Sequence, residues 1–181
     1  MTSFLLLHGW GGNSPDHWQN YLAERLLEED QSVIYPHFPN AEVPIKEEWI
    51  ETLEEALKGV QPEELVVVAH SLGCIIWLHY LNKYPQTAIQ KGYLVAPPRT
   101  DCGLLAIQNF YPLPSVQLKT HNYQIIGSNN DPYIPQEEFE RLATDTQVPF
   151  HLFKDGGHIN PLTGFGKWEW MEEECLKVIS K

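Results

Sequence analysis

The sequence is poor in basic residues: 12 Lys and Arg stand against 24 Asp and Glu, which gives a formal net charge of −12. Nucleic acids and anionic membranes are bound through clustered positive side chains, so this shortage disfavours both. The chain also lacks any run near the roughly 18 apolar residues that a membrane span needs. Its apolar N-terminal stretch, Phe4 to Leu7, is short and follows no basic segment, so no targeting signal is predicted. We expect no nucleic acid and no membrane as partners, and the sequence assigns no protein partner.

Cysteine is scarce as well. The three cysteines, Cys74, Cys102 and Cys175, are odd in number and form no CxxC pair, which argues against a disulfide framework. A reduced, cytoplasmic protein fits this pattern. Cys74 lies one helical turn after Ser71 and is expected to be a buried packing thiol. The 181 residues show no repeat, low-complexity segment or linker, so we expect one domain over residues 1–181.

Six short apolar segments alternate with segments of helical periodicity. The expected strands are Ser3–Leu7, Ser32–Tyr35, Leu65–Ala69, Gly92–Ala96, Tyr123–Ile126 and Phe150–Phe153. Helices are expected to begin near Pro15, Ile45, Leu72, Gln136 and Lys167. Segment 100–113 is less regular and is interpreted as a short helix with a loop. The alternation predicts an α/β protein with three layers: a doubly wound, mostly parallel six-stranded sheet with helices on both faces.

The segment from Leu65 to Gly73 carries the strongest functional signal. Its apolar, β-branched run predicts a buried parallel strand, and a helix-prone segment follows directly after a tight turn at Ser71. A strand, a sharp turn with Ser and a helix form a nucleophile elbow, which exposes the hydroxyl at the end of the sheet. Ala69 stands where the usual G-x-S-x-G pattern has its first Gly, a mild departure. An ordinary helix N-cap is the structural alternative for Ser71.

Two further polar residues follow later expected strands. Asp131 precedes Pro132, which disfavours helical backbone at Asp131 and so directs its carboxylate, and His158 follows two glycines in a loop. Taken singly, Asp131 could cap a turn and His158 could be solvated. Together with Ser71, however, they stand in the chain order of the α/β-hydrolase catalytic triad. We interpret the three as nucleophile, orienting acid and base, with Asp155 as the second choice for the acid.

The first expected strand runs into the loop HGWGGN, residues 8–13. In α/β hydrolases a loop at this place presents a backbone N–H beside the elbow. We therefore predict an oxyanion hole formed by the backbone N–H groups of Trp10 and Leu72. No cofactor pattern is present. No metal is expected either, because three polar residues of this region lack the spacing of ligands on one element: His8, Asp16 and His17.

With these residues in place, the chain resembles the retinoblastoma-binding-protein-9-like family of small serine hydrolases, cap-less members of the α/β-hydrolase superfamily. The resemblance rests on HGWGGNSPDHWQ (8–19), VVAHSLG (67–73), SNNDPYIP (128–135) and GGHIN…GFGKW (156–168). It implies a minimal cap-less α/β-hydrolase fold and a serine hydrolase with a Ser71–His158–Asp131 triad and no cofactor. It supplies no natural substrate.

These features together predict a small-molecule acyl substrate, an ester, thioester or amide, cleaved through an acyl-enzyme. A cap-less chain leaves a shallow pocket walled by loops, which favours short acyl groups. Candidate wall residues that follow strand ends are Trp10, Phe38, Pro97, Pro98, Phe110, Ile159 and Trp168. Two alternatives stay open: a binding module with little turnover on the same fold, and an aminopeptidase-like amidase that uses the same triad.

Overall fold

A computed structural model describes residues 2–101, 104–118 and 122–180. Within them, six strands form one sheet in the order β2-β1-β3-β4-β5-β6, and every neighbouring pair is parallel. The strand bounds are β1 Ser3–Leu7, β2 Ser32–Ile34, β3 Leu65–His70, β4 Lys91–Val95, β5 Tyr123–Ser128 and β6 Phe150–Phe153. The predicted α/β class and six-stranded parallel sheet are confirmed.

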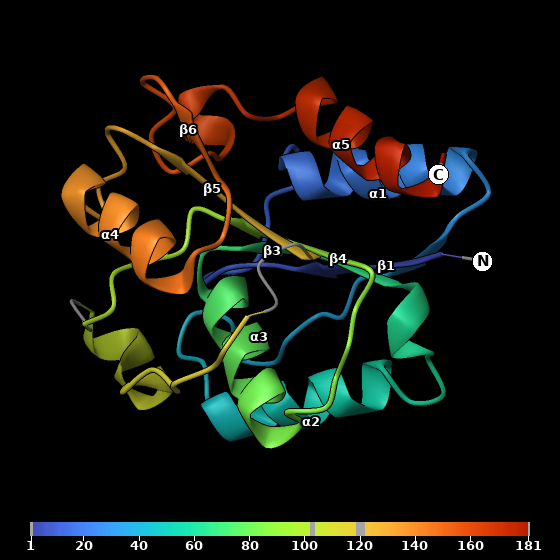
Figure 1. Ribbon diagram of the computed structural model, residues 1–181, viewed down its shortest axis with the longest axis horizontal. Helices are drawn as coiled ribbons and strands as arrows, with labels where there is room; N and C mark the ends of the chain where they lie inside the picture. Colours follow the sequence, from blue (N-terminus) through green and yellow to red (C-terminus); the bar gives the residue numbers. More distant parts are fainter. Residues whose placement is uncertain (1, 102–103, 119–121, 181) are drawn as a thin grey trace.

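In the same described ranges, five α-helices cover the two faces of this sheet. They are α1 Trp18–Glu28, α2 Lys46–Ala56, α3 Leu72–Lys83, α4 Gln136–Thr146 and α5 Glu169–Ile179, with short 3-10 helices η1 Pro62–Glu64, η2 Leu105–Phe110 and η4 Pro161–Thr163. Figure 1 shows α1 and α5 above the sheet and α2 and α3 below it. One buried apolar cluster joins α1 and α5 to the sheet, and a second joins α2, α3 and α4 to it. The chain therefore has three layers.

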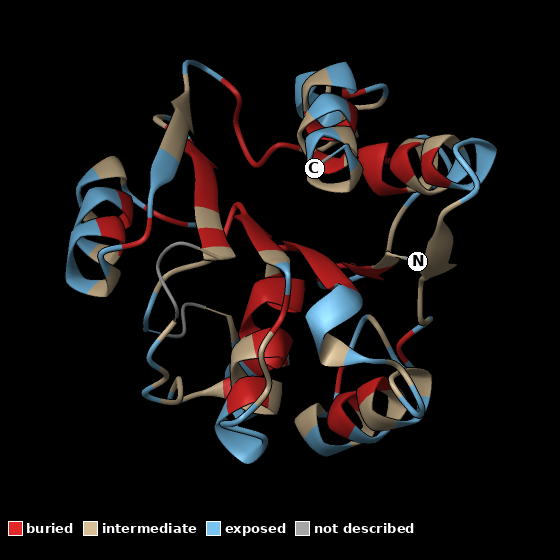
Figure 2. Cartoon of the chain, turned by 45° about the vertical axis from the view of Figure 1, so that its right-hand side comes forward, coloured by how far each residue is buried: buried red, intermediate tan, exposed pale blue. Residues whose placement is uncertain are grey.

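The central strand β3 is buried along its whole length. Its side chains alternate between the two apolar clusters: Val66 and Val68 face α1 and α5, whereas Val67 and Ala69 face the other layer. A strand that is covered on both faces needs apolar residues at every position, which explains its continuous run. In Figure 2 the strands in the middle of the sheet are coloured as buried, while the outward sides of the helices are exposed. The strand that leads to Ser71 is thus held from both sides.

The strand order reverses at β1. The chain leaves β1 for β2 on one side, and returns to place β3 on the other side of β1. The loops after β1 and β3 therefore diverge, which opens a crevice at the carboxyl ends of these two strands. Ser71 and the loop of residues 8–13 both lie at this reversal point.

The element boundaries differ from the expected ones by a few residues. Helix α1 begins at Trp18, not near Pro15, because the side chain of His17 caps the helix by accepting the N–H of Gln19. Helix α5 begins at Glu169 rather than near Lys167. The irregular segment 100–113 contains η2, although its part at 102–103 lies outside the described residues. None of the helices in the described ranges combines the length and apolarity that a bilayer crossing requires.

Candidate active site

Ser71 lies at the elbow between β3 and α3 with φ 54° and ψ −121°. Non-glycine residues rarely adopt this backbone conformation, and its surroundings must hold it in place. The N–H of Ser71 donates to the carbonyl of Val95 at 2.9 Å. At Gly73 a Cβ would overlap the carbonyl oxygen of Leu7 in β1, so glycine allows the close approach of α3 to that strand. The close contact between helix and strand occurs at Gly73 and not at position 69. The elbow can therefore form with Ala69 in place of the usual first glycine.

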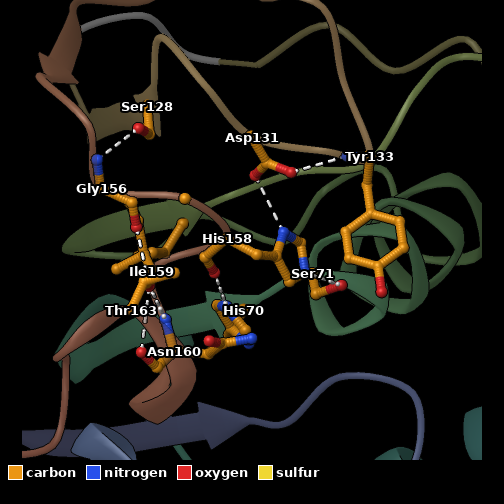
Figure 3. A network of polar contacts seen from close by, with 12 residues as sticks. His70, Ser71, Ser128, Asp131, Tyr133, Gly156, His158, Ile159, Asn160 and Thr163 are labelled. Carbon is orange, nitrogen blue, oxygen red and sulfur yellow. Dashed lines mark hydrogen bonds and ion pairs between the residues drawn. The ribbon is translucent and has the colours of Figure 1, made fainter.

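The three predicted triad residues form one chain of hydrogen bonds (Figure 3). Nε2 of His158 lies 2.9 Å from Oγ of Ser71, and Nδ1 lies 2.8 Å from Oδ2 of Asp131. A carboxylate only accepts, so Nδ1 carries the proton of the neutral ring and Nε2 accepts from the serine hydroxyl. The second carboxylate oxygen of Asp131 accepts the N–H of Tyr133 at 2.8 Å, which fixes its orientation. Asp155, the second choice for the acid, is exposed, and His158 faces Asp131 instead.

The loop that carries His158 is held by polar side chains at and just after the end of β5. Oγ of Ser128 accepts the N–H of Gly156 at 2.8 Å, and Oδ1 of Asn130 accepts the N–H of Gly157 at 2.7 Å. Gly157 has a φ of +54°, and a Cβ there would collide with the side chain of Thr163. The double glycine therefore serves a tight loop, as the sequence suggests, and that loop delivers the ring to the elbow.

A second histidine connects the elbow to this loop. His70 is buried, and its Nε2 donates to the backbone carbonyl of His158 at 3.0 Å. Burial, together with the nearby rings of His158 and His17, holds the pKa of His70 well below its usual range, so its ring stays neutral. Sequence reasoning missed this contact. It joins residues 88 positions apart, and the only local signal was a histidine next to the nucleophile.

The loop after β1 passes directly beside Ser71. A Cβ at Gly9 would lie 3.0 Å from Cβ of Ser71, so this position also favours glycine. Among the described residues, no backbone hydrogen bond uses the N–H of Trp10 or of Leu72. Leu72 is the first residue of α3, where helical N–H groups have no partner within the helix. The indole of Trp10 donates to the carbonyl of Glu42 at 2.8 Å, which anchors the loop from outside.

Gln19, fully buried near the start of α1, ties this loop to the sheet. Its Nε2 donates to the carbonyls of Leu7 and Val68 at 3.1 Å each, one at the end of β1 and one in β3. Its Oε1 accepts from Nδ2 of Asn13 at 2.7 Å, and its N–H donates to Nδ1 of His17 at 3.2 Å. One side chain therefore joins the end of β1, the interior of β3 and the loop. Sequence reasoning missed this role, although Gln19 closes the first resemblance segment.

A cavity of about 510 Å³ opens beside the triad. Ser71 and His158 line it, as do Trp10 and Leu72 of the predicted oxyanion hole. Asp16 is the one acidic side chain in the described lining, and no Lys or Arg contributes to it. The apolar part of the wall consists of Pro98, Leu104, Ile107, Tyr133, Pro161 and Leu162.

Most of the other predicted wall residues do not line this cavity. Phe38, Phe110, Ile159 and Trp168 are buried in the two apolar clusters, so their assignment to the wall is wrong. Pro97 lines a different cavity of about 410 Å³, between α3 and the segment before β5. A large apolar side chain after a strand end gains more from burial in the core than from an open pocket, at roughly 25 cal/mol per Å² of surface removed from water.

Two of the cysteines are described, and both Cys74 and Cys175 are buried free thiols. The expected packing role of Cys74 fits its surroundings, since burial raises the pKa of this thiol and keeps it protonated. Cys102 lies outside the described residues. Across residues 2–101, 104–118 and 122–180, the histidines, cysteines and acids form no group of three placed to hold a metal.

The reversal of strand order, the strained serine elbow and its flanking loops define the chain as an α/β hydrolase by fold. The family model described as serine hydrolase matches residues 4–176. The chain belongs to the serine hydrolase family.

Similar proteins agree with this assignment. The chain is 26% identical over 177 residues to YdeN of Bacillus subtilis (strain 168), a match that covers 88% of this chain and 87% of YdeN. The structure of the B. subtilis ydeN gene product has a TM-score of 0.82 at 23% identity, with 100% of both chains covered. A YdeN-like hydrolase from Pectobacterium atrosepticum gives a TM-score of 0.78 at 20% identity, covering 98% of this chain and 90% of the other. At these identities the structural matches establish the fold.

Proposed function

We propose that this chain hydrolyses a small ester, thioester or amide through an acyl-enzyme on Ser71. The observation that carries the proposal is the continuous hydrogen-bonded series from Asp131 through His158 to Ser71, which ends on a serine at a strained elbow. The backbone conformation of Ser71 supports the same conclusion, because residues held in sparsely populated conformations cluster at active sites. The proposed enzyme is a carboxylesterase-like serine hydrolase of the EC 3.1 or EC 3.4 type.

In the proposed reaction Oγ of Ser71 attacks the substrate carbonyl while Nε2 of His158 takes its proton. Asp131 holds the ring in the required tautomer and stabilises the imidazolium that forms. The imidazolium then protonates the leaving group, whose bond to the acyl carbon breaks. Water enters, gives its proton to the same nitrogen and displaces the serine from the acyl group. The imidazolium returns this second proton, which came from water, to Oγ of Ser71 and so restores the free enzyme. No step of this sequence requires a cofactor.

The oxyanion of the tetrahedral intermediate is proposed to bind the backbone N–H groups of Trp10 and Leu72. Both lie next to Ser71 along the loop or helix that flanks it, and both are free of backbone partners among the described residues. Each such donor contributes on the order of a hundredfold or more in rate. Because the groups belong to the backbone, side-chain substitution alone would not remove them.

The described cavity wall suggests a neutral or cationic substrate. It combines apolar residues with one carboxylate, Asp16, and contains no Lys or Arg that would pair with an anionic acyl group. An aminopeptidase-like amidase is the second candidate, because Asp16 could accept a substrate ammonium group. The resemblance to retinoblastoma-binding-protein-9-like hydrolases fits either activity. Buried free thiols at Cys74 and Cys175 are consistent with the cytoplasm as its proposed location.

The test is labelling with a fluorophosphonate probe, read by intact mass. We expect one adduct on the wild type and none on Ser71→Ala, because only an activated serine reacts at an appreciable rate. Ser180→Ala, which removes an exposed serine far along the chain from the elbow, is the matched control and should be labelled normally. An unlabelled but folded wild type would refute the proposal and favour a binding module with little turnover.

A substrate screen follows a positive result. Short and long p-nitrophenyl esters, a thioester and aminoacyl amides separate the esterase from the amidase. Short acyl chains should be preferred, because the elements of the described residues include no cap domain inserted over the cavity. A preference for chains beyond about ten carbons would contradict this expectation.

A further inference from the structure

His17 lies in the wall of the cavity that contains Ser71, yet it takes no part in the triad. Only 5% of the residue is exposed. Its ring packs edge-on against His70, with ring centroids 5.0 Å apart, and His70 lies at the same separation from His158. His17 is therefore no farther from the catalytic ring than twice that separation. The packing holds the ring in one position.

The hydrogen bonds of His17 assign its tautomer. Nδ1 accepts the backbone N–H of Gln19 at 3.2 Å, as the N-cap of α1, so this nitrogen carries no proton. The proton of the neutral ring is consequently on Nε2. No hydrogen-bond partner of Nε2 occurs among the described residues, and no buried side-chain nitrogen or oxygen of that part of the chain lacks a partner. Nε2 is therefore accessible, and His17 lines the cavity that contains Ser71.

The ring stays neutral under ordinary conditions. Burial, the largest effect, lowers the pKa of His17 to about 4, and His158 and His8 act in the same direction while Asp16 opposes them. A neutral imidazole whose Nδ1 already accepts a hydrogen bond can still donate one hydrogen bond, from Nε2. The cavity thus contains a fixed, uncharged donor in a wall that is otherwise largely apolar.

We propose that Nε2–H of His17 binds an uncharged oxygen of the substrate that is not the reacting carbonyl. The inference rests on the proposed function, since it concerns the substrate of the same site. It names the substrate class: esters or amides whose acyl or alcohol part carries an ether, hydroxyl or second carbonyl oxygen. A purely hydrocarbon substrate would cover Nε2–H without pairing it, and a site with an unpaired buried donor discriminates against such a ligand. His17 is therefore a specificity-determining residue.

The first experiment compares substrates that differ by one atom. One series is p-nitrophenyl hexanoate and its analogues with an ether oxygen in place of carbon 3, 4 or 5. A second series, followed by pH-stat, compares butyl hexanoate with 2-methoxyethyl hexanoate. Dividing each kcat/KM by the alkaline hydrolysis rate of the same ester removes intrinsic reactivity. We expect at least one oxygen position to be preferred by about 5–10-fold, the effect of one hydrogen bond. No preference in either series would overturn the inference.

The second experiment separates recognition from helix capping. His17→Asn keeps an N-cap, since Asn is among the best capping residues, but its short side chain cannot carry a donor to the position of Nε2. The melting temperature should fall only moderately, because the helix cap is kept while the packing of the ring against His70 is lost, and the oxygen preference should disappear. His151→Asn replaces a histidine of β6 that does not line the cavity, and should leave both unchanged. If His17→Asn kept the preference for substrates with the additional oxygen, the inference would be overturned, and His17 would act only as the N-cap of α1.

The two hypotheses can fail separately. A wild type that is neither labelled by fluorophosphonate nor active on any ester would refute the proposed function itself. A wild type that is labelled and active, but indifferent to the ether oxygen, would refute only the role of His17.

Discussion

We expect Gly73→Ala to have two opposite effects on the free energy of unfolding. Gly73 is the second residue of α3, and its φ is not in the left-handed region. In an unobstructed helix, replacing Gly with Ala stabilises the protein by up to about 1 kcal/mol. Helix propensity alone therefore predicts a more stable variant.

Packing predicts the reverse. The new Cβ would overlap the carbonyl oxygen of Leu7, and would lie 2.8 Å from its carbonyl carbon and 2.9 Å from the carbonyl oxygen of His8. These are backbone atoms of β1 and the residue after it, which cannot rotate away as a flexible side chain would. Overpacking of a well-packed site costs about 1–3 kcal/mol, and the rigid neighbours place this case at the upper end. We expect a net destabilisation of about 1–2 kcal/mol, or roughly 2–8 °C in melting temperature for a chain of this size.

The displacement should also reach the chemistry. His8 is the first residue of the loop that holds the N–H of Trp10 beside Ser71. A shift of α3 away from β1 would therefore separate the two proposed oxyanion donors. Loss of one donor lowers the rate on the order of a hundredfold or more, and we expect fluorophosphonate labelling to slow by up to that factor. Urea unfolding and labelling rates measure both effects. Gly59→Ala is the control, because a Cβ at Gly59 would meet open space. It should lower the stability only through the strain of a left-handed backbone at Ala, and it should leave the labelling rate unchanged.

The reasoning fails if Gly73→Ala is more stable than the wild type, because then propensity outweighs the contact with β1. It also fails if stability falls while labelling keeps its full rate, since the loop would not have moved with the strand.

Further predictions concern the triad and the buried histidines. In Asp131→Asn, the amide oxygen accepts the N–H of Tyr133, so the NH₂ group faces Nδ1 of His158. Nδ1 must then accept this hydrogen bond, which places the proton of the ring on Nε2, where it cannot act as a base towards Ser71. We expect kcat on an activated ester to fall by about 10³–10⁴-fold with little loss of stability. Because the folded pKa of His17 is about 4 against 6.5 in the unfolded chain, the unfolded state binds more protons between these values. The free energy of unfolding should therefore fall as pH drops from about 6.5 towards 4, by about 3 kcal/mol for this residue alone. His70 adds to the loss with the same sign. Urea titrations at several pH values test this, and a flat profile over that range would contradict it.

The sequence predicted what is local in the chain. The strand before Ser71, the elbow and the double glycine before His158 each depend on residues within a few positions of one another. Their arrangement follows from a further rule, namely that parallel strands end at one edge of the sheet. Segments after three different strands could thus be brought together without knowledge of any side-chain contact. The structure places Asp131, His158 and Ser71 within hydrogen-bonding distance in that order.

The sequence could not predict which side chains face the cavity. Phe38 and Phe110 follow strand ends just as Trp10 does, but both pack with Trp49 in the core. Trp10 instead remains 40% exposed at the cavity. The direction of a side chain after a strand end depends on the space that the surrounding helices and loops leave. That space is a property of the whole fold. For the same reason the contacts of His70 and of Gln19 with distant backbone carbonyls had no signal in their neighbouring residues.

The contacts that assemble the site are largely uncharged. His70 joins the elbow to the loop of His158 as a neutral donor, Gln19 joins β1 to β3, and Ser128 holds the loop of His158 through its hydroxyl. Neutral hydrogen bonds avoid the desolvation cost of buried ion pairs, which their mutual attraction often fails to repay. The ion pairs among the described residues give the carboxylate of Asp131 no Lys or Arg partner, and its partner there is the ring of His158. In the proposed reaction, full use of that carboxylate therefore coincides with proton transfer from Ser71, so its stabilisation is greatest in the transition state rather than in the free enzyme.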